Sequence, residues 1–400
     1  MPNDETFHAV HAYVEAHRDD LKRILCDLIR ARTVNPPGDE YRAAAVLTRF
    51  LRDHGIAHET LEKVEGRTNV VARVGTGRPR VLVPVHLDVV PPGDGWETDP
   101  FEPVEADGRI IGRGAKDNKG PLAAMMLVAA YLAEHASDLA GQLVLVGCAD
   151  EEAGSRFGMA YLLQECGLEA DLAIVPDAGF EMRQIDVGEK GALFVRVRAV
   201  GRQAHGSTPE RGASALWPVI DFLERIRSWR PPMPAEGPVT DLFTPPTLNV
   251  GALHAGTVPN MVPGECEAAI DIRYLPGTRG ADIVAHLRRE LEAVARSAEG
   301  VAMDLEFNDQ PPTLVEGEGG LVEAIERHTE AVTGRRPRRI GQSGATVAKF
   351  LILQGIPAVG FSCGPEGVEH MAGEWIALDD LARFAEVMAR VILDLAGRGA

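Results

Sequence analysis

Two histidines and several carboxylates stand at wide intervals along the chain, most of them directly after short apolar segments. They are His86, Asp88, Asp117, Glu151, Glu152, Asp177 and His370. Zinc and similar ions bind imidazole nitrogen and carboxylate oxygen, and a pair of ions needs a carboxylate that can bridge them. These residue types could therefore supply the ligands of a two-metal hydrolytic centre.

His86 closes the apolar run 81–85, and Asp88 follows two residues later. After a strand, residues i and i+2 share a face, so Asp88 can hold one ring nitrogen of His86 while the other binds a metal. The two other His-x-acid pairs, at His17 and His328, fall in predicted helices, where such residues point apart. The alternative for His86 is a core histidine whose ring is satisfied by its neighbour.

Asp117 and the acidic pair Glu151 and Glu152 lie in loops beside predicted helices or strands. Asp117 belongs to the glycine-rich segment 112–120, where a helix cap or an anion-binding loop is the alternative. Adjacent carboxylates repel one another, and a cation keeps both ionised. One of the pair can then bind metal while the other acts as general base, although solvated acidic loops are common.

Asp177 ends the apolar run 172–176, and His370 follows the predicted strand 358–361. Each alone carries little weight. Together with His86 and Glu152, they make four separate strand ends that each supply a ligand-type residue. Ligand sites of α/β proteins lie at the carboxyl ends of strands, so the conjunction favours one shared centre.

Composition limits the classes of partner. The chain has 400 residues, with Lys+Arg 41 against Asp+Glu 59 and a net charge of −18, which disfavours nucleic acid and anionic membranes. We find no apolar run of about 18 residues and no signal peptide, so we expect no membrane association and a cytoplasmic location. The five cysteines are scattered and predict reduced thiols.

Periodicity predicts an α/β protein with an inserted domain. Apolar positions spaced for helices or strands fall into segments that alternate in the first and last parts of the chain. We expect helices at 5–31, 40–54, 121–134, 213–229, 281–296, 322–331, 345–353 and 378–397, and strands at 69–74, 81–86, 143–148, 172–176, 192–200, 246–252, 265–274, 301–307 and 358–361.

Strand character divides the chain into domains. Nearly continuous apolar strands predict a mostly parallel, buried sheet, whereas residues 265–274 alternate as in an antiparallel sheet with one wet face. We therefore expect a discontinuous catalytic domain of residues 1–185 and 311–400 and an inserted α+β domain of residues 186–310.

Several motifs resemble one family of enzymes. They are Pro84–Pro91, Gly112–Gly120, Asp150–Ser155, Ala204–Ser207 with Pro209, Gly256–Asn260 and Asp271–Arg273. In this order and over nearly the whole chain, they resemble the aminoacylase/acetylornithine deacetylase/succinyl-diaminopimelate desuccinylase/glutamate carboxypeptidase family of dinuclear zinc metallohydrolases. The resemblance implies a zinc-peptidase-like catalytic domain and an inserted lid.

The resemblance also implies a role for each residue of the centre. Asp117 would bridge two ions, His86 and Asp177 would complete the first site, and Glu152 and His370 would complete the second. Asp88 would orient His86, and Glu151 would be the general base. A cis peptide bond would follow the bridging residue, between Asp117 and Asn118.

For the inserted domain, the resemblance implies dimerisation and closure over substrate through hinges near 183–188 and 308–313. His205 would reach the partner subunit's active site to stabilise the oxyanion. Arg273, with its planar fork, and Asn260 would bind a substrate with a free carboxylate, and Gly344 would lie in the pocket. Alternatively, His205 is a loop residue and Arg273 a partner of Glu267 or Asp271.

Three departures from the family pattern concern the substrate pocket. The first site has Asp177 where many members have glutamate, which is more similar to dipeptidases. His370 is flanked by Glu369 and Met371 rather than by small residues, and the stretch 341–346 lacks a common aspartate.

We therefore expect a metal-dependent amidohydrolase of N-acyl amino acids in which Glu151 deprotonates a water activated by two divalent ions, most simply zinc, with cobalt or manganese also suited. A metallo-dipeptidase or carboxypeptidase is the alternative within the family. A metal-binding scaffold without catalysis is the alternative from another class.

Overall fold

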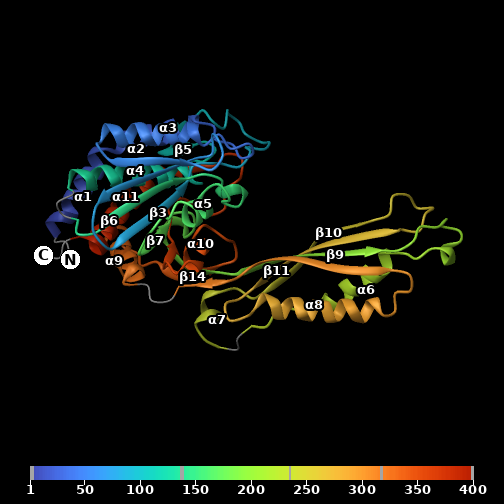
Figure 1. Ribbon diagram of the computed structural model, residues 1–400. Helices are drawn as coiled ribbons and strands as arrows, with labels where there is room; N and C mark the ends of the chain where they lie inside the picture. Colours follow the sequence, from blue (N-terminus) through green and yellow to red (C-terminus); the bar gives the residue numbers. More distant parts are fainter. Residues whose placement is uncertain (1–3, 136–138, 234–235, 316–318, 398–400) are drawn as a thin grey trace. The chain divides into compact units, whose positions relative to one another are not determined.

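A computed structural model of the chain describes residues 4–135, 139–233, 236–315 and 319–397. The chain divides into two compact units, and many of their elements are labelled in Figure 1. The first comprises residues 1–187, 315–339 and 346–400, and the second comprises residues 188–314 and 340–345.

Three segments lie outside the domain that we expected for them, and one of these, residues 186–187, belongs to the first unit. Residues 340–345 belong to the second unit rather than to the catalytic domain, as do residues 311–314. The reason is local bonding: Lys190 N–H donates to the Gln342 carbonyl at 2.9 Å, and Arg273 donates to the Ser343 carbonyl at 3.4 Å. A pattern of apolar spacing does not reveal such partners.

A nine-stranded sheet has the strand order β1-β2-β6-β3-β7-β15-β8-β13, in which β14 also pairs with β8; most of it belongs to the first unit, whereas β13, the last two residues of β8 and residues 340–342 of β14 belong to the second. Its strands are β1 (Ala57–Glu62), β2 (Thr68–Gly75), β3 (Arg80–His86), β6 (Gln142–Cys148), β7 (Leu172–Val175), β8 (Gln184–Glu189), β13 (Thr313–Leu314), β14 (Arg338–Gln342) and β15 (Ala358–Gly360). The neighbours β6, β3, β7 and β15 are mutually parallel, so their carboxyl ends meet at one edge.

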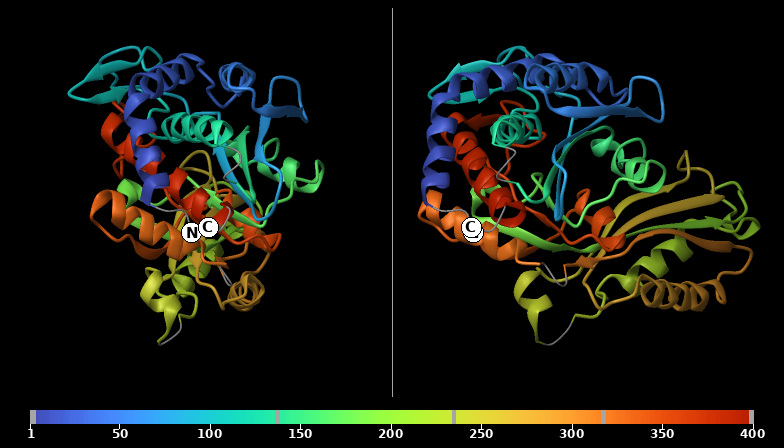
Figure 2. Two further views of the ribbon diagram at one scale, coloured as in Figure 1. Left: turned by 90° about the vertical axis from the view of Figure 1, so that its left-hand side faces the viewer. Right: turned by 60° about the vertical axis from the view of Figure 1, so that its left-hand side comes forward.

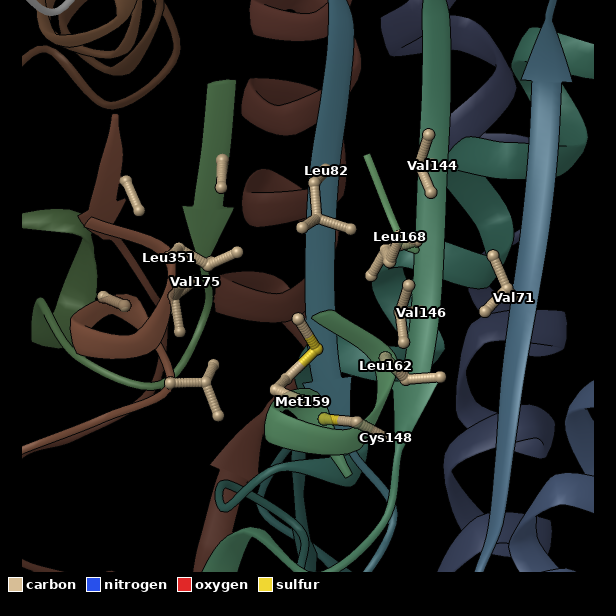
Figure 3. Packing of buried hydrophobic residues seen from close by; sticks show 14 residues of the cluster. Val71, Leu82, Val144, Val146, Cys148, Met159, Leu162, Leu168, Val175 and Leu351 are labelled. Carbon is tan, nitrogen blue, oxygen red and sulfur yellow. The ribbon is translucent and has the colours of Figure 1, made fainter. Parts of the chain in front are cut away.

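Helices cover both faces of this sheet (Figure 2). One face carries α4 (Lys119–Glu134) and α11 (Leu378–Ala396). On the other face, α5 (Met159–Gln164) and α10 (Ala348–Leu353) pack on apolar side chains of the strands. Figure 3 shows this packing, in which Met159 and Leu162 meet side chains such as Leu82, Val144 and Val146.

Further helices and a small sheet complete the first unit. They are α1 (Asp4–Ala16), α2 (Arg18–Arg30), α3 (Tyr41–Asp53), α9 (Leu321–Thr333), β4 (Val104–Ala106), β5 (Arg109–Ile111) and β16 (Trp375–Ala377). The single helix expected at 5–31 is interrupted at His17, whose φ of −112° and ψ of 22° are not helical. Among the described residues, none of the helices combines the length and apolar character needed to cross a membrane.

The second unit holds an antiparallel sheet in the order β10-β11-β9-β12. Its strands are β9 (Gly191–Val200), β10 (Thr247–Ala255), β11 (Glu265–Tyr274) and β12 (Ala302–Gln310), and its helices are α6 (Leu216–Ile226), α7 (Pro238–Leu242) and α8 (Gly280–Ala295). Helices α6 and α8 bury one face of the sheet, where Phe222 and Leu287 pack on Val197 and Ile272. Together, the two units confirm the predicted fold class.

Candidate active site

Four adjacent parallel strands deliver the candidate ligands to one edge of the sheet. Strand β3 ends at His86, β6 leads into the turn with Glu152, β7 ends two residues before Asp177, and β15 precedes the loop with His370. Asp117 lies just before α4. Since parallel strands present their carboxyl ends on the same side, residues distant in sequence become neighbours here.

Asp117 lies between the two histidines. Its Oδ1 is 2.9 Å from Nε2 of His86, and its Oδ2 is 3.2 Å from Nε2 of His370. Each oxygen of this carboxylate therefore faces a different imidazole, which is the arrangement that a bridging ligand requires. The peptide bond between Asp117 and Asn118 is cis.

The other two carboxylates each lie beside one histidine. Asp177 Oδ1 is 3.9 Å from Nε2 of His86, and Glu152 Oε2 is 3.2 Å from Nε2 of His370. Among the described residues, two donor groups result, His86 with Asp117 and Asp177 and Asp117 with Glu152 and His370, with the donor atoms of each within 4.8 Å of one another. They share Asp117.

The chemistry of these donors fits a pair of divalent cations. Two imidazoles and three carboxylates form a set whose negative charge needs compensation, and such mixed N/O ligands suit zinc and its neighbours. Glu152 Oε1 is buried and has no hydrogen-bond partner within the described parts of the chain. A buried carboxylate oxygen of this kind is costly unless it meets a cation.

Proton affinities in the cluster are strongly perturbed. Hydrogen bonds to Asp117 and Glu152 raise the pKa of His370 to about 10. Burial, reinforced by the charge of Asp117, raises the pKa of Asp177 to about 6. Burial and then the Asp177 charge raise the pKa of Glu151 well above its usual value. Metal binding would displace protons from such ligands.

Asp88 has a different set of contacts from the one we expected. Its backbone carbonyl accepts from His86 Nδ1 at 2.9 Å, while its carboxylate Oδ1 lies 3.6 Å from that nitrogen. The carboxylate instead accepts the N–H groups of Glu151 and Glu152, each at 3.1 Å, and the Asn35 side-chain amide at 2.8 Å. The Asp88 carboxylate therefore bonds the backbone of the turn with Glu151 and Glu152, here called the acidic turn, more closely than it approaches the His86 ring.

Asp150 is not a third free acid in this turn. It accepts Nη2 of Arg67 at 2.8 Å and the Phe157 N–H at 3.1 Å. Arg67 also makes a two-pronged pair with Glu40, at 2.7 Å for each bond. This buried cluster gives Asp150 a cationic partner, which it shares with Glu40, and holds the backbone from which Glu151 and Glu152 project.

Glu151 differs from its neighbour Glu152. It belongs to neither donor group among the described residues, although the charges of Asp177, His86 and Glu152 all act on it. A carboxylate beside a metal centre but outside its ligand set is suited to accept and release a proton.

Two candidate residues of the second unit lie together. His205 forms an isolated antiparallel bridge with Met261, and Gly206 N–H donates to the Asn260 carbonyl at 2.7 Å. The Ser207 N–H donates to Nδ1 of His205 at 3.1 Å. In neutral imidazole the proton is then on Nε2, so the exposed His205 ring presents a donor.

Arg273 is already engaged. Its Nε and Nη2 bind the two oxygens of Asp271 at 2.8 and 3.0 Å, as in the alternative left open by the sequence. Its Nη1 is 3.4 Å from the Ser343 carbonyl, beside Gly344 in the chain. The fork formed by Nε and Nη2 is therefore occupied, and only the edge formed by Nη1 and Nη2 remains for a ligand.

Three residues around the cluster escaped the sequence analysis. Asn35 bonds Asp88, and Arg113 forms a buried pair with Glu374 beneath the Asp117 loop. Arg113 lay within a recognised motif, but its type alone predicted no contact. Glu374 follows His370 by four residues in an irregular loop, where spacing indicates no shared face.

Comparisons with known proteins place this geometry in a family. The model of "Peptidase family M20/M25/M40" matches residues 82–394. The chain belongs to this family. A succinyl-diaminopimelate desuccinylase of Acidiphilium cryptum is 31% identical over 92% of this chain and 96% of its own. An acetylornithine deacetylase of Myxococcus xanthus is 31% identical over 87% of each chain.

Solved structures of two peptidases share the fold. Aminopeptidase PepT from Bacillus cereus has a TM-score of 0.77 at 23% identity, covering 94% of this chain and 98% of its own. Human carnosine dipeptidase 1 has a TM-score of 0.74 at 20% identity, covering 98% and 99%. The expected family is therefore confirmed, and the chain is a family M20 metallohydrolase that cleaves amide or peptide bonds.

Proposed function

We propose that this metallohydrolase removes the acyl group from N-acyl amino acids. One observation carries the proposal: two donor groups share Asp117, and Glu151 lies beside them without belonging to either. A site that only stored metal would have no use for an additional, partly buried acid. The preference for acyl substrates is supported by the relatives named desuccinylase and deacetylase, each 31% identical to this chain.

His86, Asp117 and Asp177 would hold one divalent cation, and Asp117, Glu152 and His370 a second. When bound, the two cations supply polarisation of the substrate carbonyl and of the attacking water, whose pKa they lower toward neutrality. Glu151 accepts the proton of that water and returns it to the departing amine. Zinc is our proposed metal, with cobalt and manganese as substitutes.

Residues of the second unit would complete the site. We place His205 as an oxyanion donor through Nε2, supported by the contact of its Nδ1 with the Ser207 N–H. Arg273 would bind the free carboxylate of the substrate through its Nη1 and Nη2 edge, while Asp271 holds its other edge. Asn260 and Gly344 would line the pocket. In this proposal the chain forms a homodimer in which His205 serves the partner subunit's site.

A dipeptidase is the second candidate, favoured by Asp177 at the first site. Incubation of the purified protein with N-acetyl and N-succinyl amino acids and with dipeptides, followed by mass spectrometry, separates the two. We expect release of free amino acid from an N-acyl substrate at a kcat/KM at least 10-fold above that of any dipeptide. The reverse preference would establish the dipeptidase, and cleavage of neither class would contradict both.

A further inference from the structure

Arg113 and Glu374 form a buried ion pair that contacts the backbone of two candidate metal ligands, Asp117 and His370. Their side chains are 1% and 0% exposed, and Nη1 of Arg113 lies 2.7 Å from Oε2 of Glu374. Neither residue belongs to a donor group. Arg113 precedes Asp117 by four residues, whereas Glu374 follows His370 by four, so the pair joins the two chain segments that carry these candidate ligands.

Glu374 holds the segment of Asp117. Its Oε1 accepts the backbone N–H groups of Lys116 and Asp117, both at 2.9 Å. Its Oε2 accepts the Gly114 N–H at 3.0 Å as well as the Arg113 guanidinium. One carboxylate therefore satisfies three backbone donors of a single loop, and the position of the Asp117 backbone depends on it.

Arg113 holds the segment of His370. Its Nη2 donates to the His370 carbonyl at 3.0 Å and to the Pro92 carbonyl at 3.1 Å. His370 has a φ of 63°, a left-handed conformation that is unfavourable for a residue other than glycine and persists only when its surroundings hold it. The His370 side chain is 53% exposed, so packing alone does not fix it, and the bond to its carbonyl is a direct constraint.

We propose that Arg113 and Glu374 are positioning residues that set the separation of Asp117 and His370 and thereby the affinity of the cation site formed by Asp117, Glu152 and His370. The pair acts through backbone contacts and does not touch the ion. This inference rests on the proposed use of these residues as ligands. Partners that orient metal ligands typically contribute 10- to 100-fold in affinity.

Two substitutions test the contacts of Arg113 and of Glu374 separately. Arg113→Lys keeps a positive charge opposite Glu374, but its single nitrogen cannot occupy both the Nη1 position, which bonds Glu374, and the Nη2 position, which bonds the His370 and Pro92 carbonyls. Glu374→Gln must turn its NH₂ group toward either Lys116 and Asp117 or Gly114 and Arg113. Because all of these are donors, no orientation of the amide restores the contacts.

The test is calorimetric titration of the metal-free protein with Zn²⁺ and, separately, Co²⁺. For Arg113→Lys we expect one binding step to weaken by about 10- to 100-fold while the other is unchanged, since His370 belongs to one site only. For Glu374→Gln we expect both steps to weaken, because Asp117 is shared. Unchanged affinities in both variants would overturn the proposal.

Arg390→Lys is the matched control. Arg390 pairs with Glu386 on α11, with side chains 15% and 9% exposed, and its Nη2 also donates to a backbone carbonyl, that of Phe7. This control should leave both binding steps as in the unmodified protein. Equal weakening in the control would show a general effect of losing a buried arginine and would overturn the proposal.

Circular dichroism of the metal-free variants is recorded beside each titration. If neither Arg113→Lys nor Glu374→Gln folds, the pair determines folding rather than ion affinity, and the proposal fails. The readout is binding, so it is independent of the substrate. If the unmodified protein binds two ions but cleaves no amide, the proposed function is wrong and this inference still holds. If it binds no ions, both are wrong.

Discussion

At the scale of single residues, neighbours in sequence differ sharply in their surroundings. Glu152 Oε2 lies 3.2 Å from His370, whereas Glu151 belongs to neither donor group among the described residues. The backbone N–H groups of both are held by the Asp88 carboxylate. One turn therefore holds two identical side chains in different surroundings.

Glu151→Gln tests this division. The amide has the size of the carboxylate but cannot accept a proton, so we expect kcat to fall by about 10²- to 10⁴-fold, the usual contribution of a general base. Metal content, measured by mass spectrometry, should remain that of the unmodified protein. Glu5→Gln on α1, an exposed acid, is the control and should retain full activity. Substantial turnover by Glu151→Gln would refute the assignment.

At the scale of elements, one buried cluster joins three segments around the acidic turn. Arg67, just before β2, pairs with Glu40, just before α3, and with Asp150, just after β6. The side chains of these three residues are 10%, 0% and 3% exposed. Separation of any one segment would leave buried charge without a partner, so the elements are fixed as a group.

Arg67→Ala should therefore destabilise the protein strongly. It leaves Glu40 and Asp150 buried without their counter-charge, a change that costs about 3–5 kcal/mol for a buried pair. Arg73→Ala is the control on the same part of the sheet: Arg73 and Glu59 are 40% and 48% exposed, and such pairs contribute about 1 kcal/mol or less. Urea unfolding followed by circular dichroism measures both, and equal losses would contradict the argument.

At the scale of the whole molecule, the proposed machinery is divided between two units. The candidate ligands and Glu151 belong to the first unit, and His205, Asn260 and Arg273 to the second. If the chain dimerises through the second unit, as we propose, His205 can serve the partner subunit.

Complementation tests this exchange. His205→Ala and Glu151→Gln should each be nearly inactive, because each lacks one catalytic group. After mixing under conditions that allow subunits to exchange, a mixed dimer has one complete site only if His205 acts across the interface. We then expect about a quarter of normal activity, since half of the dimers are mixed and each has one working site. No recovery despite proven exchange would mean that His205 acts within its own subunit.

Much of the fold could be predicted from sequence because helix and strand periodicities are local properties. The apolar runs at β3, β6, β7 and β15 indicated buried parallel strands, and parallel strands bring their carboxyl ends to one edge. Most of the candidate ligand cluster was predictable for the same reason: His86, Glu152, Asp177 and His370 follow these strands, whereas Asp117 lies in the loop before α4. The prediction of one helix over residues 5–31 was wrong, because the apolar periodicity continues through His17 whereas the helix is interrupted there.

The sequence by itself determined the family, the fold class and the identity of the residues that gather at the sheet edge. Only the tertiary structure decided what each of them contacts. It showed that the Asp88 carboxylate holds the acidic turn, that Asp271 occupies one edge of Arg273, and that Arg113 joins Glu374 to the His370 carbonyl. Apolar spacing is encoded over a few residues, whereas a hydrogen-bond partner depends on which distant segment the folded chain brings within about 3 Å.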